Sequence, residues 1–226
     1  MKLHSRALNA FATAGLLSLF AASQAQAQTT TMDFAGLGLS VYNAIPANYG
    51  SHGNLSVTNR TRGAFGNGPV NSCGNTTQVS YWTTGYSDLV DNVFACYNGG
   101  VGEFFFAPLN GQPVTLNYLD LGSYLAGPNG VGPSRPYDVR VYDTNWNSVF
   151  AATGTVTSTQ RINFATTSAT GLYLQWGTHW DVGVDNISTT VAGVPQSTVP
   201  EPATLAFMVP GLLAAAAFAR RRKQRA

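Results

Sequence analysis

The stretch that decides the fold is YDVRVYD, residues 137–143. Apolar and polar residues alternate along it, so Tyr137, Val139 and Val141 share one face and the polar residues take the other. A helix would need an apolar repeat of about 3.6 residues, which is absent here. The stretch therefore predicts a half-buried β-strand.

The same alternation recurs on both sides of this stretch. Leu172, Leu174 and Trp176 fall on one face of residues 171–176, and Val114, Leu116 and Tyr118 fall on one face of residues 114–118. Turn residues separate further predicted strands at 78–82, 102–107, 148–157, 160–164 and 182–188. This pattern predicts an all-β fold with two packed antiparallel sheets, a jelly-roll-like sandwich over residues 28–190.

Composition and charge exclude several classes of protein. A chain of 226 residues with 10% charged and 44% hydrophobic residues is a single globular domain rather than a charged disordered chain. Seven of the twelve Lys and Arg residues lie at the two ends. Between Gln28 and Val199 there are five arginines and nine carboxylates, which leaves a net charge of −4. Without a basic face, nucleic acid is not expected as a partner.

The first 27 residues have the order of a secretory signal peptide. Lys2 and Arg6 precede an uncharged stretch over 7–22, and Ala25 and Ala27 frame a small-residue cleavage site. We expect export by the Sec machinery across the inner membrane and cleavage after Ala27. The alternative is an ordinary buried N-terminal helix.

The C-terminal end has the order of a membrane anchor. A short polar linker (191–199) leads to seventeen uncharged residues, 203–219, and then to an arginine-rich tail. As a helix the uncharged stretch would span roughly 25 Å, slightly less than a hydrocarbon core of about 30 Å. Pro210 and Gly211 weaken such a helix, which favours a temporary tether. Because positive ends stay cytoplasmic, the acidic middle is predicted to face the other side of the membrane.

The end of the chain also carries a motif in a specific order, with a Pro-Glu-Pro before the apolar stretch and arginines after it. The residues are Val199, Pro200, Glu201, Pro202, Arg220, Arg221 and Arg222. Residues 200–226 resemble the PEP-CTERM sorting signal of Gram-negative bacteria. The resemblance implies processing by an exosortase, with delivery to the cell surface or to an extracellular matrix rich in exopolysaccharide and biofilm. A plain C-terminal tail anchor is the alternative.

Cys73 and Cys96 are the only two cysteines. In an exported chain they are expected to form a disulfide. Closing a loop of about 24 residues would stabilise the fold by roughly 3 kcal/mol in the chain-entropy model. A catalytic thiol is a poor alternative, because the two cysteines would oxidise together outside the cytoplasm.

No catalytic motif stands out in the middle of the chain. The signatures of serine hydrolases, zinc proteases and phosphate-binding loops are all missing. His52 and His179 have no helper motif, so each is interpreted as a loop or surface imidazole. Glu103 together with an aspartate could supply the two carboxylates of a glycosidase, but no particular pair is indicated. We therefore predict a protein that is not an enzyme.

Exposed tryptophans favour glycan binding, because aromatic rings stack on the apolar faces of sugars. Trp146 lies in a predicted hairpin turn, 143–147, and Trp180 lies in a predicted loop, 177–180. Together they would form a sugar-binding pair if both were exposed on one face or at one end. Packing at the edge of the sandwich is the alternative for each.

Two short segments resemble the ends of jelly-roll carbohydrate-binding modules and galactose-binding-like domains. These are 33–36, which opens the domain with Asp33, and 182–187, which closes it with Asp185. The resemblance implies a structural Ca²⁺ held by the two carboxylates, and hard oxygen ligands suit this ion. Alternatively, Asp185 and Asn186 end a strand and bond their own backbone. No other cofactor is required.

These observations predict an exported, exosortase-processed surface or matrix protein. Its non-catalytic β-sandwich would associate with extracellular polysaccharide by binding glycans. The alternative is a structural surface protein that associates with copies of itself and binds no glycan. An extracellular hydrolase is the third hypothesis.

Overall fold

The computed structural model describes residues 27–96, 99–109, 111–178 and 180–193. The predicted signal peptide up to residue 26, most of the predicted linker and the predicted sorting signal lie outside these residues, as does His179. Gln26–Val194 form a compact unit of their own. Within the described part of the chain, no helix has the length and apolar character needed to cross a membrane.

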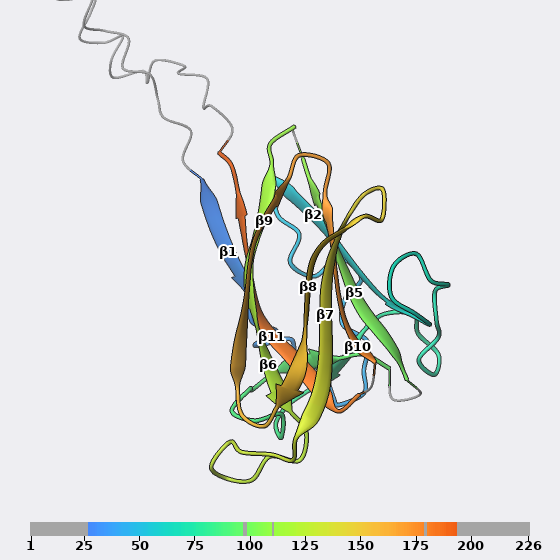
Figure 1. Ribbon diagram of the computed structural model, residues 1–226, viewed down its shortest axis with the longest axis vertical. Helices are drawn as coiled ribbons and strands as arrows, with labels where there is room; N and C mark the ends of the chain where they lie inside the picture. Colours follow the sequence, from blue (N-terminus) through green and yellow to red (C-terminus); the bar gives the residue numbers. More distant parts are fainter. Residues whose placement is uncertain (1–26, 97–98, 110, 179, 194–226) are drawn as a thin grey trace, which may run out of the picture. The chain divides into compact units, whose positions relative to one another are not determined.

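The described residues form two antiparallel sheets that pack face to face (Figure 1). One sheet has the order β3-β4-β11-β6-β9, with β1 also paired to β11, and the other has the order β2-β5-β10-β7-β8. The two-sheet sandwich predicted from the sequence is confirmed. The strands are β1 (Gln28–Met32), β2 (Leu55–Arg62), β3 (Ser80–Trp82), β4 (Asn92–Phe94), β5 (Gly100–Pro108), β6 (Val114–Ser123), β7 (Arg135–Asp143), β8 (Ser148–Val156), β9 (Gln160–Ser168), β10 (Leu172–Thr178) and β11 (Val182–Val191).

All eight predicted strands are present, and β1, β2 and β4 are additional. The sequence pattern does not predict β2, because two residues that face inward on this strand, Asn59 and Thr61, are polar. Loops satisfy these buried groups. The Asn59 amide donates to Pro46 O at 2.8 Å, and the Thr61 hydroxyl donates to Asn71 O at 2.7 Å. Such partners, 13 and 10 residues away in the chain, leave no local pattern.

The core lies between the two sheets. Leu172, Leu174 and Trp176 are buried in it, as their alternation predicted. Gly102 leaves space for the Trp176 indole, because a Cβ at this position would lie 2.4 Å from Cζ2 of that ring. Phe104 stacks on the same indole with 5.6 Å between ring centroids.

One predicted face is wrong. Val114 and Leu116 are in the core, but the register of β6 against β9 shifts between Leu116 and Tyr118. This bulge turns Tyr118 outward, where the Arg161 guanidinium lies 3.8 Å from its ring centroid. Beyond the bulge Leu119 faces the core instead.

A charged layer is buried on the outer face of the five-stranded sheet. Glu103 on β5 has no exposed surface. Its Oε2 accepts hydrogen bonds from Arg62 Nε at 2.5 Å and Gln175 Nε2 at 2.6 Å, and Arg60 Nε lies 3.0 Å from its Oε1. Gly66 covers the layer: its N–H donates to Gln175 Oε1, and its carbonyl accepts from Gln175 Nε2. The glutamate therefore ties three strands and a loop together.

Candidate functional site

The candidate site lies at the β3 side of the six-stranded sheet. The segment 42–45, which begins in a turn, pairs with β3 and covers its free edge. Tyr42 N–H donates to Tyr81 O at 3.0 Å, Tyr81 N–H donates to Asn43 O at 2.8 Å, and Ile45 N–H donates to Val79 O at 3.2 Å. This pairing places the Tyr42 side chain beside the strand that carries Trp82.

Six aromatic side chains meet at this side of the sandwich, and we call them the aromatic edge. The Trp82 ring contacts Tyr42 at 4.9 Å and Tyr124 at 5.5 Å between centroids, and Tyr124 contacts Trp180 at 4.6 Å. The aromatic edge consists of Tyr42, Trp82, Tyr86, Phe94, Tyr124 and Trp180. Tyr86 and Phe94 are buried beneath it, whereas Tyr42 is 57% exposed.

The backbone around the aromatic edge is strained. Tyr42, Ser87, Asp91 and Leu125 all have positive φ angles, of 67°, 53°, 60° and 63°. A residue with a side chain rarely adopts this conformation, and it is least favourable for a bulky one such as tyrosine. Strain of this kind persists where the surroundings over-determine a conformation, and it concentrates at binding sites.

A pocket of about 360 Å³ opens beside the aromatic edge. Three pieces of chain line it: residues 42–44, residues 73–76 and Ser80. Its lining residues include the exposed Tyr42 and the polar residues Asn43, Asn75 and Thr76. Among the described residues, neither the Asn43 nor the Asn75 side-chain amide forms a hydrogen bond.

The predicted disulfide between Cys73 and Cys96 is confirmed, and it borders this pocket. Cys73 begins a tight turn in which its N–H donates to Thr76 O at 2.7 Å, and Gly74 has a φ of +64°. Cys96 lies just beyond β4. The disulfide therefore ties the polar wall of the pocket to the sheet.

The lining of the pocket suits a small polar ligand with one apolar face. An aromatic ring contacts the C–H face of a sugar, while amide and hydroxyl groups bind its hydroxyls. Tyr42 is the aromatic residue of the lining, and Asn43 and Asn75 carry the hydrogen-bonding groups, since the Thr76 hydroxyl already bonds Gln78. A volume of this size falls within the range of small-molecule sites.

Trp146 is in the predicted turn but packs against the sheet. The Trp146 ring stacks on Tyr173 with 4.1 Å between ring centroids. The central carbon of the Arg62 guanidinium lies 4.7 Å from the centroid of the Trp146 ring. Tyr173 in turn stacks on Phe105 at 4.2 Å. The Trp146 ring is therefore part of a packed aromatic row on the five-stranded sheet, and it is half-buried.

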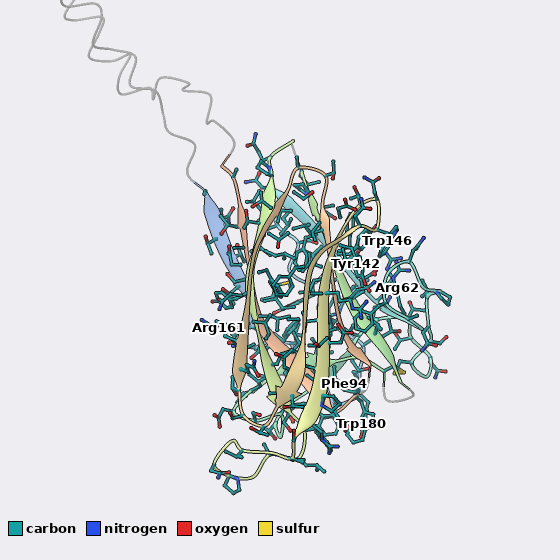
Figure 2. All side chains as sticks on the ribbon, viewed as in Figure 1. Arg62, Phe94, Tyr142, Trp146, Arg161 and Trp180 are labelled. Atoms are coloured by element: carbon teal, nitrogen blue, oxygen red, sulfur yellow. A yellow bond between two sulfur atoms is a disulfide. The ribbon has the colours of Figure 1, made fainter. Side chains whose placement is uncertain are left out.

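Trp180 belongs to the aromatic edge, so the structure does not bring the two predicted tryptophans together. Figure 2 shows Trp146 with Arg62 and Tyr142, well separated along the vertical long axis from Trp180 and Phe94. Both indoles are half-buried. The pocket residues Tyr42, Asn43 and Asn75 were missed because the pairing of segment 42–45 with β3 has no local sequence signal.

The structure places Asp33 near Asp185. Burial raises the pKa of Asp185 to about 7, and the charges of Asp33, Asp120 and Asp91 add to the rise, whereas the hydrogen bond from Asn186 N–H lowers the pKa. That N–H donates to Asp185 Oδ1 at 2.7 Å. Among the described residues, no group of three or more His, Cys, Asp or Glu side chains could hold a metal ion. The alternative interpretation is wrong in one part, because Asp185 and Asn186 do not end a strand but lie inside β11, where its register against β6 shifts; the backbone hydrogen bond that it expected is present.

Asp185 should make the domain less stable as the pH rises. Because its pKa is higher in the folded chain than in the unfolded chain, the folded state holds a proton that the unfolded state releases. The stabilisation from this bound proton is complete below pH 4 and is lost by about pH 7. Between pH 5 and pH 7 the free energy of unfolding should fall by roughly 2 kcal/mol. Asp185→Asn should remove this slope, measured as urea unfolding at several pH values.

Parallel pH curves for the wild-type protein and Asp185→Asn would contradict this prediction. The same unfolding curves with Ca²⁺ and with a chelator test the predicted calcium site. A chelator that leaves both curves unchanged would count against an ion held by Asp33 and Asp185.

No protein-family model matches the sequence, and no curated protein matches it. Among solved structures, it is similar to a Ruminococcus gnavus GH29 fucosidase in complex with fucose, with 15% identity and a TM-score of 0.29 over 62% of this chain and 26% of the fucosidase. It is also similar to a mutant of the lectin binding domain of lectinolysin complexed with Lewis b, with 13% identity and a TM-score of 0.28 over 67% of this chain and 100% of that domain. A third similar structure is the arabinose-bound MgGH51 α-L-arabinofuranosidase, with 11% identity and a TM-score of 0.27 over 74% of this chain and 31% of that enzyme. Likeness at this level assigns neither a family nor a function to the chain.

Proposed function

We propose that this chain is an exported, exosortase-processed protein of the bacterial surface or extracellular matrix that binds polysaccharide without catalysis. The two ends of the chain support this localisation. A predicted export signal precedes the sandwich, and the Pro200-Glu201-Pro202 motif, the apolar stretch and the arginine tail follow it in order. The jelly-roll-like sandwich is the part that acts outside the cell.

The pocket at Tyr42 is the proposed glycan site. The observation that carries this proposal is an exposed tyrosine ring at a pocket whose other side chains are mostly hydrogen-bonding groups. Free amides on Asn43 and Asn75 suit the hydroxyl groups of a sugar, since their hydrogen-bonding capacity is unused within the described residues. The disulfide beside the pocket limits the ordering needed on binding.

We expect Tyr42→Asn to weaken binding to the exopolysaccharide of the producing bacterium by about tenfold, which corresponds to about 1.4 kcal/mol of lost ring contact. Asparagine tolerates a positive φ, so the change removes the ring without adding backbone strain. Binding is measured by polysaccharide pull-down and a glycan array with the sandwich unit, and thermal unfolding confirms that the variant is folded.

The matched control is Tyr118→Ala, which removes a half-exposed tyrosine from the outer face of β6. This variant should bind as the wild-type protein does. Loss of binding in Trp146→Ala but not in Tyr42→Asn would move the site to the five-stranded sheet and contradict the pocket. Absence of binding to any glycan would overturn the proposed activity.

A further inference from the structure

The edges of the two sheets are protected unequally. Loops hydrogen-bond to the free edge of β2, where Asn59 N–H donates to Ala47 O at 3.1 Å and Thr61 N–H donates to Thr77 O at 2.6 Å. Segment 42–45 covers β3. On β9, a register shift interrupts the pairing and Arg161 adds a charge, and β1 has only five residues. Each of these features discourages pairing with another chain.

β8 has only one of these features, a register shift against β7 between Val141 and Tyr142, and that shift lies at the start of the strand, before Phe150. It pairs with β7 on one side only, and in the described structure no loop hydrogen-bonds to its other side. Its nine residues, SVFAATGTV, include no charge and no proline. Val149 is 45% exposed, and Ala151, Thr153 and Thr155 are also exposed. A long, uncharged edge strand with free N–H and C=O groups is a template for strand addition.

We propose that β8 is a dimerisation edge, where a second copy of this chain adds its own β8 in antiparallel orientation. Two copies of β8 can pair with one another, because a twofold axis beside the strand brings no like charges together. Opposite β8, the charged residues Asp138 and Arg140 of β7 form an ion pair at 2.7 Å, and Arg135 forms one with Asp181 at 3.0 Å. Since each copy has one such edge, the assembly closes at two chains and joins both five-stranded sheets into one.

This interface is independent of the glycan pocket, which borders the other sheet. A single pair of strands forms a small contact, so the dimer should dissociate on dilution. Two copies joined in this way carry two pockets, and a polysaccharide with repeated units could engage both at once. The gain in apparent affinity would come from effective concentration rather than from a new contact.

The test is the molar mass of the sandwich unit in solution, measured by sedimentation over a wide range of concentration. This unit is compact and contains its own core, from Met32 to Val191, so it is suited to study without the terminal segments. We expect a reversible monomer–dimer equilibrium. Thr153→Lys, at an exposed edge position, should leave only monomer, because two lysines would meet near the twofold axis.

The matched control is Thr58→Lys, the same change at an exposed position of β2, whose edge is already covered. It should dimerise as the wild-type protein does. A wild-type chain that is monomeric at all concentrations would overturn the proposal. A dimer that survives Thr153→Lys, or an open-ended polymer, would equally refute a closed contact through β8.

Discussion

Glu103→Ala is expected to lower the free energy of unfolding by about 3–5 kcal/mol, the usual cost of leaving a buried charge without its partner. The change removes the carboxylate that accepts from Arg62 at 2.5 Å and from Gln175 at 2.6 Å. The Arg62 side chain is only 6% exposed, so water cannot readily replace the lost partner. Urea unfolding at neutral pH measures the loss.

Asp138→Ala is the matched control for this substitution. It also removes a carboxylate that is paired with an arginine on the same sheet, but here the side chains of Arg140 and Asp138 are 39% and 19% exposed. Solvent screens such a pair, so its loss should cost less than about 1 kcal/mol. Equal losses in the two variants would show that the Glu103 layer contributes no more than a surface ion pair.

Replacing Pro200, Glu201 and Pro202 with alanine is expected to abolish sorting completely. In a Gram-negative host with an exosortase, the unaltered chain should lose its C-terminal segment and leave the inner membrane. Without the motif, the apolar stretch 203–219 and the arginine tail should keep the full-length chain in that membrane. Intact-mass measurement and membrane fractionation distinguish these outcomes.

The control for this experiment replaces linker residues 196–198 with alanine, which alters neighbouring sequence but leaves the motif intact. That variant should be processed normally. Equal processing of the motif variant, or processing of the unaltered chain in a host without exosortase, would contradict exosortase sorting, whereas an unaltered chain that stays full-length in the membrane of the exosortase host would favour a plain tail anchor.

The strands could be predicted wherever burial follows a simple alternation. β7 and β10 alternate clearly, and their inward residues, among them Val139, Val141 and Trp176, are fully buried. In β2 the alternation is hidden, since loop carbonyls bind its inward polar groups. In β6 a bulge reverses it, so Tyr118 faces outward although its spacing from Leu116 placed it in the core.

The candidate site could be predicted only in part. Aromatic residues in loops indicated a ligand-binding edge, and Trp180 lies in one. Trp146 looked equivalent by sequence, but its ring stacks on Tyr173 and lies close to the Arg62 guanidinium. The charge of Asp33 acts on Asp185, but the hydrogen bonds seen at the Asp185 carboxylate come from its own neighbour, Asn186, and the predicted Ca²⁺ stays a prediction.

By itself, the sequence determined the all-β class and the pairing of its two cysteines, because the first follows from local alternation and the second from the presence of only two thiols. The expected export and sorting signals at its two ends follow from motifs of fixed order. Only the tertiary structure decided that Tyr42 and Asn75 line one pocket, that Glu103 is buried among arginines and that β8 is left open. These features depend on which strands and loops pair across long separations, and that choice minimises unpaired buried polar groups over the whole domain rather than within any one segment.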